Sequence, residues 1–260
     1  MQSRLPMIFI LLTVVLDSMG IGLIMPVMPD LIQSLEGGDL GQAALWGGVL
    51  ATIFAVMQFL FGPTIGSISD RFGRRPVLLI ALVVMSFDYV LMAVAGTIWL
   101  LVIGRIIGGI TAATQSTASA YMADISKPED KAANFGLIGA AFGIGFVIGP
   151  MLGGILAEYG TRAPFWAAAV LAGANGIFGY FALPETVTDR IRRPFDIKRA
   201  NPLGAFKSIT QLPDLGRFMI ISFVISLAFF VYPSVWAYFG KLQFGWGPGM
   251  IGLSLGAFGI

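Results

Sequence analysis

The predicted fold is arranged around residues 66–75, GSISDRFGRR, which form a short polar island between two long apolar segments. Its four charged residues are Asp70, Arg71, Arg74 and Arg75. The flanking segments, about residues 43–65 and 77–95, each reach the ~20 residues that a bilayer-spanning helix needs. We therefore predict a tight loop at one membrane face between two spanning helices.

Two interpretations of this loop are open. An ordinary basic loop would set the topology of the helices, but three basic residues would suffice for that. The added Asp70 and the glycines Gly66 and Gly73 favour a specific loop structure with a functional role beyond setting topology. The glycines suit close backbone approach, and Pro76 suits the first turn of the next helix.

The composition predicts an all-α integral membrane protein. Only 12% of the 260 residues are charged, 57% are hydrophobic, and the mean hydropathy is +0.85, whereas soluble domains carry about 25% charged residues. The pI near 9.0 does not indicate nucleic acid, since the basic residues flank membrane spans. The absence of Cys and His excludes disulfides, thiolate or imidazole metal sites and triad catalysis. We therefore predict neither an enzyme nor a metal site.

Apolar periodicity divides the chain into two parts joined by a linker. Residues 1–184 hold six predicted spans, and residues 185–214 form a charged, proline-containing cytoplasmic linker. Residues 215–260 hold a seventh span and an eighth apolar run that is still apolar at Ile260, so we expect a truncated second half. The predicted spans cover about residues 6–35, 43–67, 76–95, 98–122, 133–158, 164–183 and 215–239, with the eighth run from 247.

The Lys and Arg residues orient the chain. Thirteen of the sixteen lie in the amino terminus, in the loops after the second and fourth predicted spans, and in the linker with its edges. Arg162 and Lys241 lie on the other side of the membrane, and Arg105 lies inside a span. Because cytoplasmic loops carry the excess of basic residues, we predict a multi-pass inner-membrane protein with its amino terminus in the cytoplasm.

Three ionisable residues lie within predicted spans: Asp17, Asp88 and Arg105. A charge in the hydrocarbon layer costs at least ~2.5 kcal/mol, so each should pair or face a watery cavity. One interpretation is a structural Asp88–Arg105 ion pair. The other is a central cavity whose carboxylates bind a cation or a proton, since burial makes a carboxyl group hold its proton and a nearby guanidinium promotes its release.

These residues carry a resemblance to a known family. Gly66, Asp70, Arg71, Gly73, Arg74 and Arg75 resemble the signature between the second and third helices of major facilitator superfamily transporters. The strings SDRFGRRPVLL, residues 69–79, and LDSMGIGLIMPVMP, residues 16–29, are similar to those of tetracycline efflux proteins. The resemblance implies the amino-terminal six-helix half of that fold plus the first one or two helices of its second half.

The resemblance also implies a function. The family exports a metal-tetracycline cation in exchange for protons, so the implied partners are a small-molecule substrate, protons and the lipid bilayer. No resident cofactor is implied, because a proton gradient drives export and the divalent metal travels with the substrate. Asp17, Asp88 and Arg105 fall where the family has its intramembrane charges, and Gln58 matches a family polar residue. The family also has a histidine in the eighth helix, which we expect just after Ile260.

Three further features take on roles in this interpretation. Gln115, in the polar inner half of the fourth span, is a candidate for substrate contact. Asp124 is expected to pair with Arg74 and to latch one conformation, the alternative being a solvated surface pair worth ~0–1 kcal/mol. Glycines spaced four apart in the fifth span predict close helix packing and resemble the superfamily's antiporter signature: Gly145, Gly149, Pro150, Gly153 and Gly154.

Two rival functions remain open at this point. One is a transporter of the same fold for another drug or a metabolite, because a few cavity side chains choose the substrate and the fold does not. The other is a non-transporting half-protein that acts as a membrane scaffold or partner. The oligomeric state is open as well.

Overall fold

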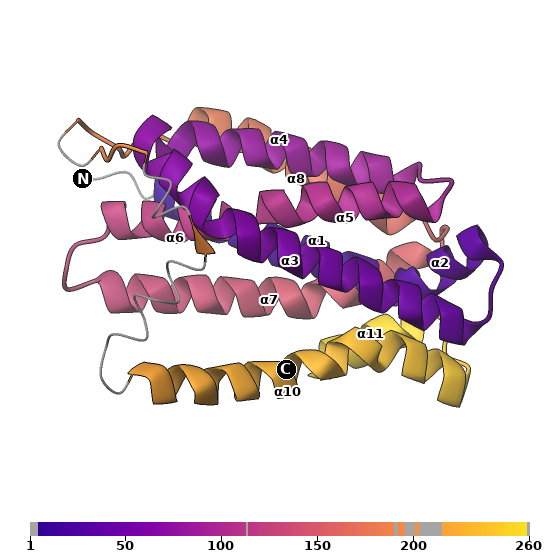
Figure 1. Cartoon of the computed structure of the whole chain (residues 1–260). Helices are drawn as coiled ribbons and strands as arrows, with labels where there is room; N and C mark the ends of the chain where they lie inside the picture. Colours follow the sequence, from indigo (N-terminus) through magenta and orange to yellow (C-terminus); the bar gives the residue numbers. More distant parts are fainter. Residues whose placement is uncertain (1–4, 113, 190–191, 196–200, 203–214, 259–260) are drawn as a thin grey trace.

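The computed structural model describes residues 5–112, 114–189, 192–195, 201–202 and 215–258. The described chain forms a bundle of roughly antiparallel helices (Figure 1). The helices are α1 (Leu5–Ile24), the 3₁₀ turn η1 (Met25–Val27), α2 (Met28–Glu36), α3 (Leu40–Phe72), α4 (Arg74–Ala93), α5 (Ile98–Ala112), α6 (Thr114–Ile125), α7 (Lys131–Ala157), α8 (Ala163–Ala182), α10 (Leu215–Phe244) and α11 (Pro248–Phe258).

The prediction of an all-helical membrane protein is confirmed. Within the described residues, seven helical segments are long and apolar enough to span a bilayer, and α11 is a shorter apolar helix. The first predicted span is a composite of α1, η1 and α2, with Pro26 in the 3₁₀ turn and Pro29 in the first turn of α2. Most of the predicted linker, residues 185–214, lies outside the described residues.

The predicted loop at residues 66–75 is wrong in its extent. Helix α3 continues to Phe72 and α4 begins at Arg74, so Gly73 alone lies between the two helices. Gly73 adopts φ = 113°, a conformation open to glycine at little cost, and its N–H donates to the Ser69 carbonyl over 3.1 Å. A Cβ at Gly66 would meet only Ser116 Oγ, at 3.8 Å. The close approach predicted at Gly66 is therefore not found.

The two ends of the bundle are named here by their turns. The Gly73 end holds the start of α1, the α3–α4 turn, the residues between α6 and α7, and the end of α8 (Figure 1). The Gly37 end holds the α2–α3, α4–α5, α7–α8 and α10–α11 turns. At that end Gly37 closes α2 in the left-handed conformation, and Asp39 caps α3 by accepting from the Gln42 N–H over 2.8 Å.

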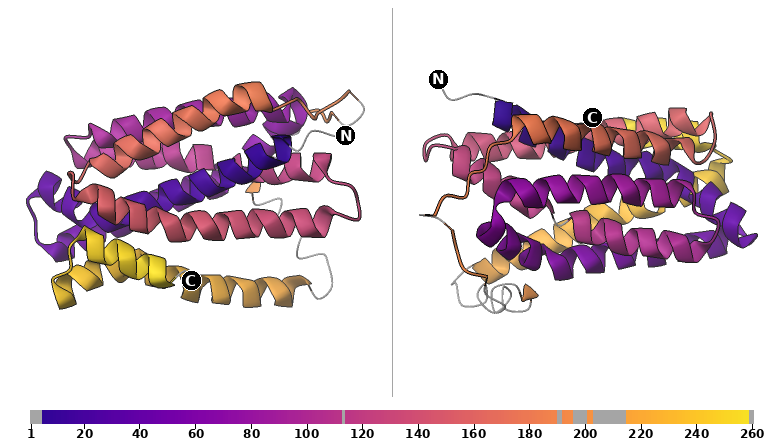
Figure 2. Two further views of the ribbon diagram at one scale, coloured as in Figure 1. Left: turned by 180° about the vertical axis from the view of Figure 1, so that it is seen from behind. Right: turned by 90° about the horizontal axis from the view of Figure 1, so that it is seen from above.

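Helix packing brings α1 to the centre of the first six spans. It contacts α7 and α8, while α4 packs on α8 and α5, and α3 packs on α5 (Figure 2). Buried apolar clusters fill the two ends, including Leu31 and Phe165 at the Gly37 end and Phe9 and Tyr121 at the Gly73 end. The outer surface carries large apolar side chains such as Phe87, 70% exposed, as a lipid-facing surface should.

Helix α10 meets the rest of the bundle through α11, α2 and α3. Near the Gly37 end, Lys241 donates to the Asp30 carboxylate and, over 2.7 Å, to Gln33 Oε1. Toward the Gly73 end α10 is exposed, with Phe218 at 74% and Ile220 at 67%. In the described chain, α10 is therefore anchored at one end of the bundle.

Candidate functional site: a polar cavity between the helices

A cavity opens in the middle of the bundle, between the apolar clusters of its two ends. Its empty volume is about 590 Å³, part of it open to the surroundings. Six helices line it, so their packing brings together the five predicted cavity residues, which are Asp17, Gln58, Asp88, Arg105 and Gln115. The remaining lining is apolar, aromatic or small and comprises Val14, Ser18, Ile21, Ile24, Phe54, Met85, Tyr89, Gly108, Ala112 and Phe142.

Asp88 is held against α5 by two glycines. Its side chain is almost fully buried, at 3% exposure. A Cβ at Gly108 would lie 2.7 Å from Asp88 Oδ2, and one at Gly104 would lie 3.1 Å from Oδ1. Any larger residue at either position would push the carboxyl group away. The two glycines thus make room for the acid in the cavity wall.

Arg105 lies near Asp88 without a direct ion pair. Within the described chain, no Arg105 nitrogen lies within 4.0 Å of an Asp88 oxygen. The guanidinium instead donates to Met92 Sδ and lies 5.4 Å from the centre of the Phe54 ring, a cation–π geometry. The structure therefore does not have the ion pair that the sequence left open.

Several polar atoms of ionisable side chains at the cavity have no hydrogen-bond partner in the described protein. They are Asp17 Oδ1, Asp88 Oδ1 and Arg105 Nε, all buried. Buried polar atoms are nearly always paired, and each exception calls for an explanation. Two carboxyl groups and a guanidinium that share one cavity can take a ligand bearing positive charge and hydrogen-bonding groups.

The glycines of α7 have two faces. A Cβ at Gly149 would lie 2.6 Å from the Met19 carbonyl oxygen, and Gly145 and Gly153 likewise meet the α1 backbone. Gly154 faces α11, where a Cβ would lie 2.6 Å from the Pro248 carbonyl oxygen. Close backbone contact of this kind holds helices together in lipid, where apolar burial alone gives no preference. Pro150 lies between these faces, against Gly22 of α1.

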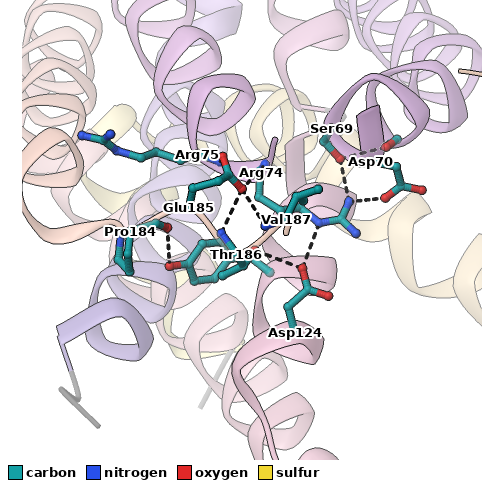
Figure 3. Close-up of polar contacts among 11 residues, drawn as sticks. Ser69, Asp70, Arg74, Arg75, Asp124, Pro184, Glu185, Thr186 and Val187 are labelled. Carbon is teal, nitrogen blue, oxygen red and sulfur yellow. Dashed lines mark hydrogen bonds and ion pairs between the residues drawn. The ribbon is translucent and has the colours of Figure 1, made fainter. Parts of the chain in front are cut away.

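A second polar cluster lies at the Gly73 end, around Arg74 (Figure 3). Arg74 Nε lies 3.2 Å from Asp124 Oδ2, as the sequence predicted, and the same guanidinium pairs with Asp70 and donates to Ser69 Oγ over 2.7 Å. The Arg74 and Asp124 side chains are only 11% and 19% exposed. This is a partly buried network rather than the solvated surface pair considered as its alternative.

Glu185 is the residue of this cluster that sequence reasoning missed. Its carboxylate accepts from the backbone N–H groups of Arg74 and Arg75, over 2.9 and 3.2 Å, and so caps the amino terminus of α4, where an anion is favoured. Thr186 links the same segment to Asp124 through a 3.0 Å hydrogen bond. An acid just after the sixth span, on the face that holds the arginines, was the signal that could have found it.

Two predicted members of the cluster lie differently. Arg75 turns toward α8, where Nη2 donates to the Tyr180 carbonyl over 2.8 Å and the guanidinium lies 5.4 Å from the Tyr180 ring centre. Arg71 is exposed, its guanidinium 5.3 Å from the Phe72 ring centre. The structure thus brings Asp70, Arg74 and Asp124 together and places Arg71 outside their network.

A metal centre made of protein side chains is not found in the part of the chain that the structure describes. No group of three or more potential metal-ligating residues occurs there. The acids of the cavity are Asp17 and Asp88. A metal ion in this cavity would therefore have to bring most of its ligands with it.

The bundle and its central polar cavity define a class of protein: polytopic α-helical membrane proteins with a binding site among their helices, as in secondary transporters. The chain belongs to the Major Facilitator Superfamily, whose sequence model matches residues 10–260. It is therefore a member of a family of membrane transporters, and its relatives include tetracycline resistance proteins.

Two tetracycline resistance proteins of Escherichia coli illustrate the similarity. The class C tetracycline resistance protein is 44% identical over 260 residues, which are all of this chain and 65% of that protein. The class E protein is 38% identical, and the match covers 96% of this chain and 61% of that protein. The chain thus spans a little under two thirds of these relatives.

Among solved structures, a bacterial homologue of the human lysosomal transporter Spinster matches 99% of this chain with a TM-score of 0.79. The match covers 60% of that protein, which was crystallised inward-facing and unoccupied, at 17% sequence identity. At that identity the likeness supports the fold alone. The prediction of a major facilitator fold is confirmed.

Proposed function

We propose that this protein exports a drug, best identified as a metal-tetracycline cation, across the inner membrane in exchange for protons. The observation that carries the proposal is the cavity in which Asp17, Asp88 and Arg105 meet among aromatic walls. Relatedness to tetracycline resistance proteins supports the substrate class.

The chemistry is a competition for the carboxyl groups. A cationic substrate and a proton both neutralise a buried acid, and a buried charge without compensation is costly. Binding of one therefore favours release of the other. The positive charge of Arg105 offsets part of the negative charge of the Asp17 and Asp88 carboxylates. Gln58 and Gln115 offer amide groups that can form hydrogen bonds with polar substituents of the substrate.

Transport is proposed to follow from rocking of two halves around this site. Residues 1–184 form the first half, residues 185–214 the linker, and residues 215–260 the beginning of the second half. The Gly73 end is cytoplasmic in this proposal, since it holds the α3–α4 turn with Arg71, Arg74 and Arg75. Gly154 of α7, which packs against α11 where the first half meets the second, would let the halves slide without separating.

Uptake by everted membrane vesicles tests the function. Vesicles from cells that express the natural gene product should accumulate magnesium-tetracycline when the interior is acidified, and a protonophore should abolish the accumulation. Vesicles without the protein are the control. If the protonophore left the accumulation of tetracycline unchanged, proton exchange would be excluded.

A same-fold transporter of another drug is the second candidate, favoured by the mainly apolar and aromatic lining of Phe54, Met85, Tyr89 and Phe142. Such walls accept many flat apolar molecules, because they offer few directional groups. A panel of competitors in the same vesicle assay separates the two candidates. Inhibition by unrelated cationic drugs, with none by tetracycline, would favour the second.

Replacing Asp124 by asparagine is expected to reduce transport about tenfold while leaving substrate affinity nearly unchanged. Hydrogen bonds to charged groups contribute about 1.5–3 kcal/mol, and losing one that is made in a single conformation shifts the conformational equilibrium by about tenfold or more. The measurement is the initial rate of tetracycline uptake by vesicles, together with equilibrium binding.

The matched control for this prediction is Asp189→Asn. Asp189 is 98% exposed and lies 3.7 Å from Arg192 in an ordinary surface pair, which contributes little. Its replacement should leave transport unchanged. Equal rates for wild type and Asp124→Asn would show that the Arg74–Asp124 contact is no latch.

A further inference from the structure

A second, smaller cavity borders Asp17. Residues of α1, α4 and α6 line it, and its empty volume of about 240 Å³ includes space open to the surroundings. The enclosed part has room for about one water molecule. It shares Asp17 and Met85 with the central cavity. The remaining lining residues are Thr13, Leu78, Ala81, Leu82 and Ala118.

This small cavity lies toward the Gly73 end of the bundle. Thr13 precedes Asp17 by one helical turn on α1, which begins at that end, and Leu78 lies near the first turn of α4. Asp17 therefore borders two spaces, the central cavity and a small one closer to the proposed cytoplasmic face.

Thr13, which lines this small cavity, belongs to a buried hydrogen-bonded pair. Asn175 of α8 donates from Nδ2 to Thr13 Oγ1 over 3.0 Å, and both residues are 2% exposed. Because Thr13 Oγ1 accepts this bond, its own hydroxyl hydrogen remains to donate. Asp17 Oδ1 is buried without a hydrogen-bond partner in the described protein. A donor and an acceptor one helical turn apart thus border a space the size of a water molecule.

We propose that the small cavity binds a water molecule between Thr13 and Asp17, and that this water takes the proton that Asp17 releases. The substrate then reaches Asp17 from the central cavity while the proton leaves on the opposite side. The inference rests on the proposed proton exchange and adds a route that the substrate does not obstruct.

The proton transfer is simple to balance. The O–H bond of the protonated Asp17 carboxyl breaks and an O–H bond forms on the water. The resulting hydronium then gives its proton to a water molecule that reaches it from the cytoplasm when the bundle opens at the Gly73 end. The Asp17 carboxylate that remains pairs with the cationic substrate. Asp17 is the one titratable residue that lines the small cavity, whereas Asp88, Tyr89 and Arg105 face it across the central cavity.

Thr13→Val tests the proposal, since it removes the hydroxyl and keeps the shape of the side chain. In purified protein reconstituted in lipid, the infrared carboxyl band that disappears in Asp17→Asn reports the hydrogen bonding of Asp17. We expect this band to shift in Thr13→Val, and to respond to H₂¹⁸O in the wild type but not in Thr13→Val. Thr13→Ser should restore the wild-type band.

Proton release on addition of magnesium-tetracycline gives the second readout. A pH-sensitive dye should report release about five- to tenfold slower in Thr13→Val, the effect of one lost hydrogen bond, with tetracycline affinity changed by no more than about twofold. Thr52→Val is the matched control, because the Thr52 hydroxyl is exposed and donates to the Gly48 carbonyl.

The outcomes separate this inference from the proposed function. An unchanged Asp17 band and an unchanged release rate in Thr13→Val would overturn the water site. Tetracycline binding by the wild type without any proton release would overturn the proposed exchange and the role of the water in it, while the infrared band would still decide whether water bridges Thr13 and Asp17.

Discussion

Replacing Asp88 by asparagine is expected to lower proton-coupled transport by the natural gene product about a hundredfold. The amide keeps the shape of the side chain between Gly104 and Gly108 but can neither carry charge nor exchange a proton. Arg105 would then lack a nearby compensating acid, and an uncompensated charge inside the membrane costs about 2.5–3.5 kcal/mol. A difference of that size corresponds to roughly a hundredfold in rate.

The measurement is the initial rate of tetracycline uptake by acidified vesicles, normalised to the amount of folded protein. Asp39→Asn is the matched control, since Asp39 caps α3 at the Gly37 end and asparagine caps a helix about equally well. Its transport rate should stay at the wild-type level. If Asp88→Asn transported as fast as Asp39→Asn, Asp88 would have no part in the exchange.

Gly149→Ala is expected to destabilise the protein and to remove transport almost completely. The added Cβ would lie 2.6 Å from the Met19 carbonyl oxygen and 3.0 Å from the Gly22 Cα. Both are backbone atoms, so α1 and α7 would have to move apart, and overpacking of this kind typically costs about 1–3 kcal/mol or more. Separation of these helices would also displace Asp17, which lies on α1.

Gly143→Ala is the matched control on the same helix. Its Cβ would meet nothing within 4 Å, and alanine favours a helix over glycine by about 1 kcal/mol. Thermal unfolding followed in detergent should show a lower midpoint for Gly149→Ala and an equal or higher one for Gly143→Ala. Equal midpoints for the two variants would mean that the α1–α7 contact tolerates side chains.

Features that depend on local sequence were predictable. An apolar run of about twenty residues has one satisfactory structure in lipid, a helix, because every backbone polar group must be paired within it. Asp17, Asp88 and Arg105 were recognisable as unusual for the same reason, since lipid makes each of them costly. Topology placed Arg74 and Asp124 at the same membrane face, and the resemblance to the family supplied the prediction that they pair.

Helix ends and contacts between distant segments were harder to predict from the sequence. Residues 66–72 look polar enough for a loop, yet α3 continues through them to Gly73. Glu185 caps α4 from more than a hundred residues away, and Lys241 binds Asp30 across the contact between α10 and α2. Such contacts depend on how helices sit relative to one another, which periodicity within a single helix does not specify.

The order of apolar and charged residues along the chain is enough to specify which segments enter the membrane and which charges enter with them, because the free energy of placing a residue in lipid depends on that residue and its neighbours in the chain. Three features became visible only in the folded bundle: six helices enclose one cavity, Asp88 lies between two glycines without pairing directly with Arg105, and Asp17 borders a second cavity. These features arise from close packing of backbones, and packing is a property of all the helices together.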